Sequence, residues 1–241
     1  RSKIHYTFIT PVICGYIGIF EHLIDNRPFQ FILITRRSQN NAGIRYKTRG
    51  MNDDGNVANF CKSQQIVIYK NILYSYCQLR GSAPIFFEQI GLRANTDITQ
   101  DKNMTINAFN RHLNEMHEDF KLICFINLLN KKKTTESPII KEFEQQIEFK
   151  GNEKPKFRYI YFDMQNECPK DNYSRIDNLI NTISPIISLF GFFACNLKTN
   201  QIFSIQKGTP RTNCLDCLDR THVVQTRISW KILENMFNFL K

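Results

Sequence analysis

Apolar and polar positions along the first part of the chain form short runs that favour strands. Residues 29–35 are almost continuously apolar, and residues 64–69 and 73–79 are two further runs separated by only three residues. Two strand-like runs joined by so short a step are typical of a β-hairpin. The predicted strands of this part are 6–20, 29–35, 64–69, 73–79 and 85–88.

The rest of the chain changes to a pattern in which helices and strands alternate. Met104, Phe109, Leu113 and Met116 recur at helical spacing. Pro185 is expected to kink or end the helix that contains it. The predicted helices are 101–120, 139–149 and 173–188, and the predicted strands are 121–130 and 157–163. This order predicts an α/β fold with a mixed β-sheet flanked by helices.

A polar stretch from Lys207 to Thr221 separates two apolar runs, 189–195 and 202–205, from an amphipathic helix that runs to the C-terminus. The pattern predicts a strand, a tight loop and a helix N-terminus in that order. Backbone N–H groups at such a junction bind anions, and the helix dipole adds positive potential. We therefore expect a phosphate-binding loop there, formed by Asn213, Cys214, Leu215, Asp216, Cys217, Leu218 and Asp219.

Cys214 and Arg220 have the spacing that a covalent phosphatase requires. A helix N-terminus beside a cation favours the thiolate form of a cysteine, so Cys214 is the candidate nucleophile. The guanidinium of Arg220 can hold two oxygens of the transferred phosphoryl group. Thr221 can donate a hydrogen bond to the thiolate. The expected chemistry is phosphate-monoester hydrolysis through a phosphocysteine, without metal or cofactor.

Cys214 and Cys217 also form a Cys-x-x-Cys pair, which leaves two other interpretations open. The pair could be half of a zinc site, although the chain has no second such pair. It could equally be a redox pair, but this would leave Arg220 and Thr221 unexplained. We expect Cys217 to pack against or tune Cys214.

The charge of the chain indicates an anionic partner. The formal net charge is +10 and the pI is near 9.2. The basic residues are scattered, with one run at 131–133, and no nucleic-acid signature is present. We therefore rank an anionic lipid surface above DNA or RNA. The length of 241 residues fits one large domain or two small ones.

The eight cysteines are dispersed, which disfavours a disulfide scaffold and fits a reducing cytosol. The longest apolar stretch, 186–197, is too short to cross a bilayer. We expect a cytoplasmic protein that lies peripherally on the cytosolic face of membranes. The chain begins without Met and ends after one helix, as expected of a fragment whose full-length form could carry an anchor.

Residues 211–225, RTNCLDCLDRTHVVQ, closely resemble the signature of the Sac-domain phosphoinositide phosphatases. The family usually has Met where this chain has Leu215 and Asn where it has His222. Residues 41–60 and 80–89 resemble two further family motifs, and Phe162 with Asp163 resembles another, although Gln165 replaces the usual His. The resemblance covers nearly the entire chain.

The resemblance implies that residues 1–241 are a Sac catalytic subdomain with a cysteine-phosphatase-like fold, lacking the family's N-terminal subdomain and C-terminal extension. Arg45 and Arg49, four residues apart in a strand-like segment, are expected to share a face and hold a polyanionic head group or to pair with a nearby Asp. Lys207 is expected at the mouth of the loop as a third substrate contact.

An inositol alkoxide is a poor leaving group, so a general acid should protonate it. Asp216, Asp219 and Asp163 are the candidates. Asp219 could instead cap the helix, and the Gln165 substitution weakens the case for Asp163. Asp216 is therefore preferred.

The expected function is dephosphorylation of phosphoinositides, with phosphatidylinositol 4-phosphate or 3-phosphate favoured by the resemblance. Two alternatives remain open at this point. One is a soluble inositol phosphate or protein phosphatase that uses the same loop. The other is a catalytically weak or inactive phosphoinositide-binding module.

Overall fold

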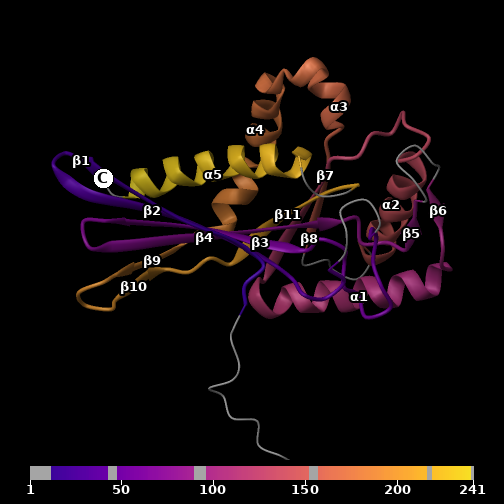
Figure 1. Cartoon of the computed structure of the whole chain (residues 1–241), viewed down its shortest axis with the longest axis horizontal. Coiled ribbons are helices and arrows are strands. Elements are labelled where there is room, and N and C mark those ends of the chain that lie inside the picture. The colour runs from indigo at the N-terminus through magenta and orange to yellow at the C-terminus, as the bar shows by residue number, and fades with distance from the viewer. Residues whose placement is uncertain (1–11, 43–47, 90–95, 152–156, 216–218, 240–241) are drawn as a thin grey trace, which may run out of the picture.

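The computed structural model describes residues 12–42, 48–89, 96–151, 157–215 and 219–239. These residues form a nine-stranded mixed sheet with helices packed on both faces (Figure 1). The strands of the main sheet are β1 (Gly15–Ile24), β2 (Arg27–Arg37), β3 (Cys61–Tyr69), β4 (Ile72–Ser82), β7 (Leu122–Asn127), β8 (Phe157–Tyr161), β9 (Phe193–Asn196), β10 (Ile202–Ser204) and β11 (Gly208–Cys214). A separate two-stranded sheet pairs β5 (Phe87–Glu88) with β6 (Asp97–Ile98).

The helices are α1 (Lys102–Asp119), α2 (Ser137–Gly151), α3 (Met164–Glu167), α4 (Ile176–Phe190) and α5 (Asp219–Phe239), with two short 3₁₀ turns, η2 (Pro169–Asp171) and η3 (Tyr173–Arg175). Asp101 caps α1, because its carboxylate accepts the Met104 amide at 2.9 Å. The α/β class with a mixed, helix-flanked sheet is therefore confirmed.

The antiparallel part of the sheet is a meander from β1 to β4. The β3–β4 hairpin predicted from the sequence is confirmed, with Tyr69 opposite Ile72. Lys70 and Asn71 both have positive φ, 51° and 62°. This backbone matches the twist of the two strands and closes the tight turn.

The parallel part of the sheet brings together strands that are distant in sequence. β11 runs parallel to both β4 and β7, and β8 runs parallel to β7. The carboxyl ends of all four strands therefore lie at one edge of the sheet. Such an edge is where open α/β sheets bind their ligands.

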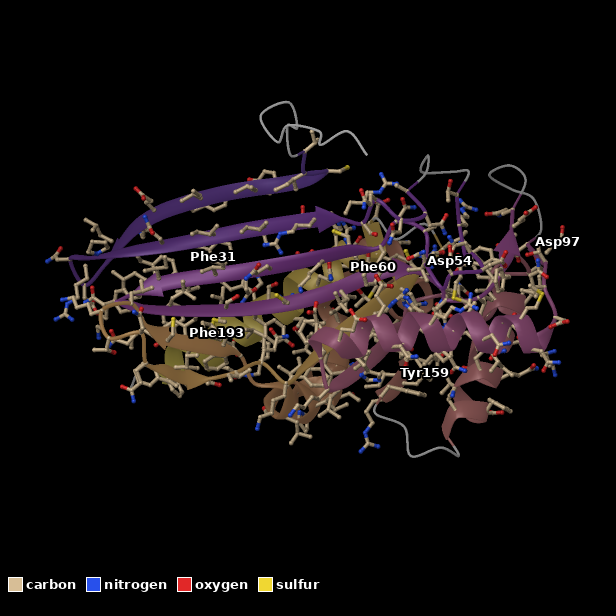
Figure 2. All side chains as sticks on the ribbon, turned by 90° about the horizontal axis from the view of Figure 1, so that it is seen from below. Phe31, Asp54, Phe60, Asp97, Tyr159 and Phe193 are labelled. Carbon is tan, nitrogen blue, oxygen red and sulfur yellow. The ribbon has the colours of Figure 1, made fainter. Side chains whose placement is uncertain are left out.

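Two apolar cores lie on opposite faces of this sheet. On one face α4 and α5 pack against Tyr74, Tyr76 and Ile126. On the other face α1 and α2 pack against Phe125 and Ile123. Alternate residues of β7 thus belong to opposite layers, as strand geometry requires. Figure 2 views the sheet from the side on which α1 lies, and on this side no described helix covers strands β1 to β3.

The strand that leads into the phosphate-binding loop differs from the expectation. β11 consists of Gly208–Cys214, the first half of the stretch interpreted as loop, and all seven residues are buried. The apolar residues before it contribute to β9 and β10, a hairpin that joins the main sheet through the pairing of β9 with β4. A polar sequence forms a central strand here because its side chains find hydrogen-bond partners within the core.

Pro185 neither ends α4 nor lies near its end. The helix continues for five further residues to Phe190. The second possibility raised by the sequence, termination at Pro185, is therefore wrong. Tertiary packing of Ile183, Ile187 and Phe190, all buried, outweighs the hydrogen bond that proline cannot donate.

Candidate active site

Cys214 is the last residue of β11, at the carboxyl edge of the parallel strands. Its neighbours in register are Ser82 at the end of β4 on one side and, one residue back, Asn127 at the end of β7 on the other. The Cys214 side chain is fully buried. The sheet therefore places the candidate nucleophile at the base of the site.

The first turn of α5 supplies the other residues of the motif. The helix begins at Asp219, Arg220 follows it, and Thr221 is fully buried. Strand β11 and helix α5 thus hold Cys214 and Arg220 at the two ends of the phosphate-binding loop. Asp216, Cys217 and Leu218 lie outside the described residues.

Arg220 forms a bidentate ion pair with Glu136. Its Nη1 lies 2.9 Å from Oε2 and its Nη2 lies 3.0 Å from Oε1. Nη1 also donates to the carbonyl of Leu128 at 3.1 Å. The side chains are only 16% and 3% exposed, so the pair is largely desolvated. Glu136 is the most direct contact of the motif that the sequence analysis missed.

Glu136 is itself held in place by the loop between β7 and α2. Its Oε2 accepts the amide of Asn130 at 2.7 Å, and its own amide donates to the carbonyl of Lys133 at 3.0 Å. The residue immediately precedes α2, whose N-terminus favours negative charge. The carboxylate is therefore fixed by the backbone before Arg220 reaches it.

A chain of hydrogen bonds fixes Asn213, the residue before the cysteine. Its Nδ2 donates to Oδ1 of Asn127 at 2.8 Å, and Asn127 Nδ2 donates to the hydroxyl of Tyr159 at 2.9 Å. Burial raises the pKa of the Tyr159 hydroxyl well above its usual value. Asn213 thus serves to orient the strand end from a fully buried position.

Arg211 is fully buried beneath the site, which the sequence analysis did not foresee. Its Nη1 donates to the carbonyl of Gly81 at 3.0 Å and its Nη2 to the carbonyl of Ser82 at 2.6 Å. Gly81 cannot carry a Cβ here, since that atom would lie 3.0 Å from the guanidinium and 2.7 Å from Val57. Arg211 therefore ties the end of β4 to β11.

Ser82 links a second family-like motif to the loop. Its hydroxyl donates to the carbonyl of Leu215 at 3.3 Å and accepts the amide of Gly50 at 2.9 Å. Arg49 precedes Gly50 and is thereby brought close to the loop backbone. The segment at Arg49 is irregular rather than strand-like, so the expected strand is not found there. Arg45 lies outside the described residues.

The position expected for Lys207 must be corrected. Lys207 precedes β11, and its carbonyl accepts the amides of Lys121 and Leu122 at the opposite end of the strand from Cys214. Seven strand residues at about 3.3 Å each separate the two by roughly 20 Å. Lys207 therefore does not lie at the mouth of the loop, because residues 208–214 are strand and not loop.

Asp163 follows β8 at the same edge of the sheet. Its carboxylate accepts the Asn166 amide at 3.1 Å and the Tyr161 hydroxyl at 3.2 Å, so it caps the short helix α3. Gln165, where the family has His, accepts from Asn130 at 3.2 Å. Asp163 thus has a structural role independent of proton transfer.

His222, in the first turn of α5, and Arg80, on β4, interact electrostatically. Partial burial and then the nearby Arg80 cation lower the pKa of His222, while Asp219 acts in the opposite direction. Arg80 is in register with Thr212 on β11 and is a second cation near the loop. Arg80 belongs to the family-like motif at residues 80–89 but was not among the predicted site residues.

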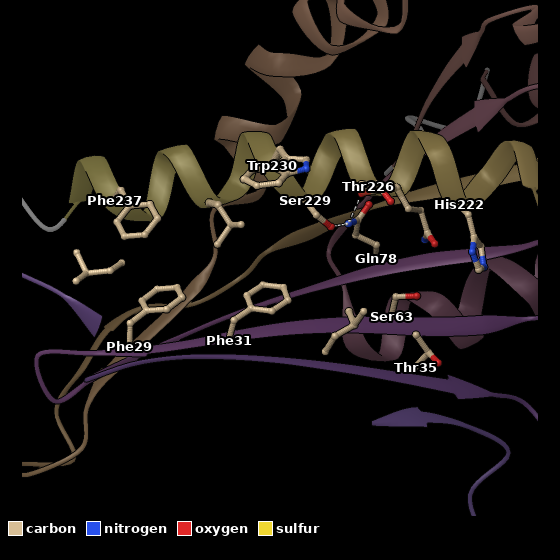
Figure 3. A pocket seen from close by; sticks show the side chains of 14 residues that line it. Phe29, Phe31, Thr35, Ser63, Gln78, His222, Thr226, Ser229, Trp230 and Phe237 are labelled. Carbon is tan, nitrogen blue, oxygen red and sulfur yellow. Dashed lines mark hydrogen bonds between the residues drawn. The ribbon is translucent and has the colours of Figure 1, made fainter. Parts of the chain in front are cut away.

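A well-formed groove in the described part of the chain lies away from Cys214. It is a groove of about 580 Å³ between α5 and strands β2 and β3, lined by Phe29, Phe31, Trp230 and Phe237, with His222 at the end nearer the loop (Figure 3). Its lining is mainly apolar, whereas a phosphate requires donors and cations. The groove is therefore distinct from the phosphate site.

The described part of the chain contains neither a membrane-spanning helix nor a metal-ligand cluster. No helix there is long and apolar enough to cross a membrane. No cluster of three or more His, Cys, Asp or Glu side chains in the same ranges could hold a metal ion.

Comparison with known proteins places the chain in a family. The model of the SacI homology domain matches residues 1–169. The chain is 36% identical to the uncharacterized protein C19F5.03 of Schizosaccharomyces pombe over 95% of its length, and 39% of that protein is covered. It is 33% identical to phosphatidylinositol-3-phosphatase SAC1-A of Danio rerio, over 95% of this chain and 39% of that protein.

The chain is also 34% identical to phosphatidylinositol-3-phosphatase SAC1 of Saccharomyces cerevisiae, over 96% of its length and 38% of that protein. It thus spans about two fifths of the length of these curated relatives. The family suggested by the loop residues is confirmed: the chain belongs to the SacI homology domain family.

Proposed function

We propose that residues 1–241 form the catalytic subdomain of a phosphoinositide phosphatase. One observation supports the proposal: Cys214 ends a central parallel strand, and α5 begins shortly after it at Asp219, with Arg220 and Thr221 in its first turn. This is the arrangement in which a thiolate, a guanidinium and a helix dipole converge on one phosphate. The phosphatase names of the two SAC1 relatives agree with it.

The proposed reaction has two steps. The thiolate of Cys214 attacks phosphorus, forming a P–S bond as the P–O bond to the inositol ring breaks. Water then attacks the phosphocysteine, which releases inorganic phosphate and regenerates the thiolate. Arg220 stabilises the charge on the equatorial oxygens in both steps. Thr221 donates a hydrogen bond to the departing sulfur.

The first step needs a proton for the leaving alkoxide. We assign it to Asp216, which lies within the loop, between the nucleophile and Arg220. Asp163 is less suitable, because its carboxylate is engaged by the Asn166 amide and the Tyr161 hydroxyl. In the second step Asp216 takes a proton from the attacking water.

The proposed substrate is a monophosphorylated phosphatidylinositol, with phosphate at ring position 3 or 4, on the cytosolic face of a membrane. Two described cations support the binding of an anionic head group. Arg80 lies near His222 of α5. Arg49 precedes Gly50, whose amide donates to the Ser82 hydroxyl that in turn donates to the carbonyl of Leu215. Arg45 is proposed to act with Arg49. The net charge of +10 favours an anionic lipid surface.

The test is phosphate release from short-chain phosphoinositides phosphorylated at single ring positions, with soluble inositol phosphates and a phosphotyrosine peptide alongside. The proposal predicts turnover of the 3- or 4-phosphate lipid above the soluble substrates. Equal turnover of soluble inositol phosphates would favour a soluble-substrate phosphatase instead. Binding of the lipids to the chain without any phosphate release would indicate a phosphoinositide-binding module.

A further inference from the structure

Glu136 is separated from Arg220 by 84 residues in sequence, yet its carboxylate forms a bidentate ion pair with the arginine. Two of its features distinguish it from a surface partner. It is 3% exposed, and both of its carboxylate oxygens face the guanidinium. A bidentate pair of this kind sets the plane of the guanidinium as well as its position.

The guanidinium carries five N–H groups in a rigid plane. Three of them are directed to Glu136 and to the carbonyl of Leu128. These contacts fix the plane in which the guanidinium can meet the oxygens of a phosphoryl group.

We propose that Glu136 is the positioning residue of Arg220, fixing the plane and position of its guanidinium for contact with the transferred phosphoryl group. The inference rests on the proposed phosphatase function. The backbone supports it: Asn130 donates to Glu136 at 2.7 Å, and the β7–α2 loop that carries both residues follows β7, the strand beside β11. The sheet and its following loop therefore fix the position of the carboxylate, and the carboxylate fixes the orientation of the Arg220 guanidinium.

A purely structural role is the competing explanation, because removing one partner of a buried ion pair destabilises a protein. The two roles differ in how Glu136 and Arg220 combine. A positioning residue acts through Arg220, so its loss should matter little once Arg220 has been changed. A structural staple would lower activity by the same factor in either background.

The experiment is a double-mutant cycle of Glu136→Gln and Arg220→Lys, with kcat, KM and the affinity for inorganic vanadate measured for each form. Gln keeps the size and one acceptor of Glu while removing the charge. Glu234→Gln is the matched control, since Glu234 pairs with Lys231 at 2.9 Å and its side chain is 63% exposed. Thermal melts establish that each variant is folded.

Glu136→Gln is expected to lower kcat about 10- to 100-fold, the scale on which orienting partners act. KM should change little, and vanadate affinity should fall by a similar factor to kcat. In the Arg220→Lys background, Glu136→Gln should add less than about a further twofold, because the group it orients is gone. Glu234→Gln should leave all three quantities unchanged.

Three outcomes would overturn the inference while leaving the phosphatase proposal intact: an unchanged kcat in Glu136→Gln, an equal loss in both backgrounds, or a higher kcat, which would mean that Glu136 holds Arg220 away from phosphate. The opposite failure is also distinguishable. If the wild-type chain bound vanadate, Glu136→Gln weakened that binding, and no phosphoinositide was turned over, the phosphatase proposal would fail and the positioning role would stand.

Discussion

Nη2 of Arg211 lies 3.4 Å from Nε2 of His112 in the core beneath the loop. Both side chains are essentially inaccessible to solvent. Burial, and then the guanidinium, lower the pKa of His112 well below its usual value. His112 therefore stays neutral in the folded chain, since its protonation would place two cations against each other.

The first prediction concerns acid stability. Below a pH of about 6.5 the unfolded chain protonates His112 while the folded chain does not. The free energy of unfolding is therefore highest above that pH and decreases as pH falls through it. The loss attributable to His112 between pH 7.5 and 5.5 should be about 1 kcal/mol. Denaturant unfolding at the two pH values measures it.

His112→Gln should remove this part of the pH dependence, because Gln does not titrate. His22→Gln, on the exposed strand β1, is the control and should leave the pH dependence as in the wild type. Identical slopes for wild type and His112→Gln would show that His112 binds protons equally in the folded and unfolded chain, which would contradict its lowered pKa.

The second prediction concerns the geometry of Arg220. Lys keeps the charge but lacks the planar fork, so it cannot hold Glu136 and a phosphate at once. Arg220→Lys should lower kcat by roughly two or more orders of magnitude, as when a preorganised donor is lost. Steady-state kinetics on one soluble short-chain substrate measure the effect.

Arg227→Lys on the same helix is the control, since Arg227 pairs with the exposed Asp177 at 2.6 Å. It should retain nearly full activity. If a folded Arg220→Lys form kept most of its turnover, Arg220 would be a structural cation and not a clamp on phosphate.

The third prediction separates two roles for Asp163. Asn is as good a helix cap as Asp, so Asp163→Asn should leave stability and kcat nearly unchanged, whereas Asp163→Ala should lose about 1 kcal/mol of stability. Thermal or denaturant unfolding and kcat are measured for both. A fall in kcat of about 100-fold or more in a stable Asp163→Asn form would instead identify Asp163 as the general acid.

The elements predicted from sequence were those decided by local pattern. The β3–β4 hairpin and α1 follow from alternation, helical spacing and the Asp101 cap, all of which act over a few residues. Cys214 and Arg220 were likewise selected from a contiguous motif; they lie at the end of β11 and the start of α5, and their catalytic roles stay predictions.

Features that depend on distant partners were missed. β11 has a polar sequence but is a buried strand, because Thr209, Arg211 and Asn213 form hydrogen bonds with β4 and β7. Only the folded sheet brings these partners alongside. The error over Lys207 follows directly from taking this strand for loop. Glu136 gave no local signal except its place before a predicted helix, since its partner is 84 residues away.

The central claim is that Cys214 is the nucleophile. The most direct measurement is phosphate release from a short-chain phosphatidylinositol 4-phosphate or 3-phosphate by the wild type and by Cys214→Ser, with head-group binding measured for both. The account predicts that Cys214→Ser binds the lipid and releases no phosphate, because a serine hydroxyl in that position is not activated. Comparable phosphate release by the two forms would contradict it.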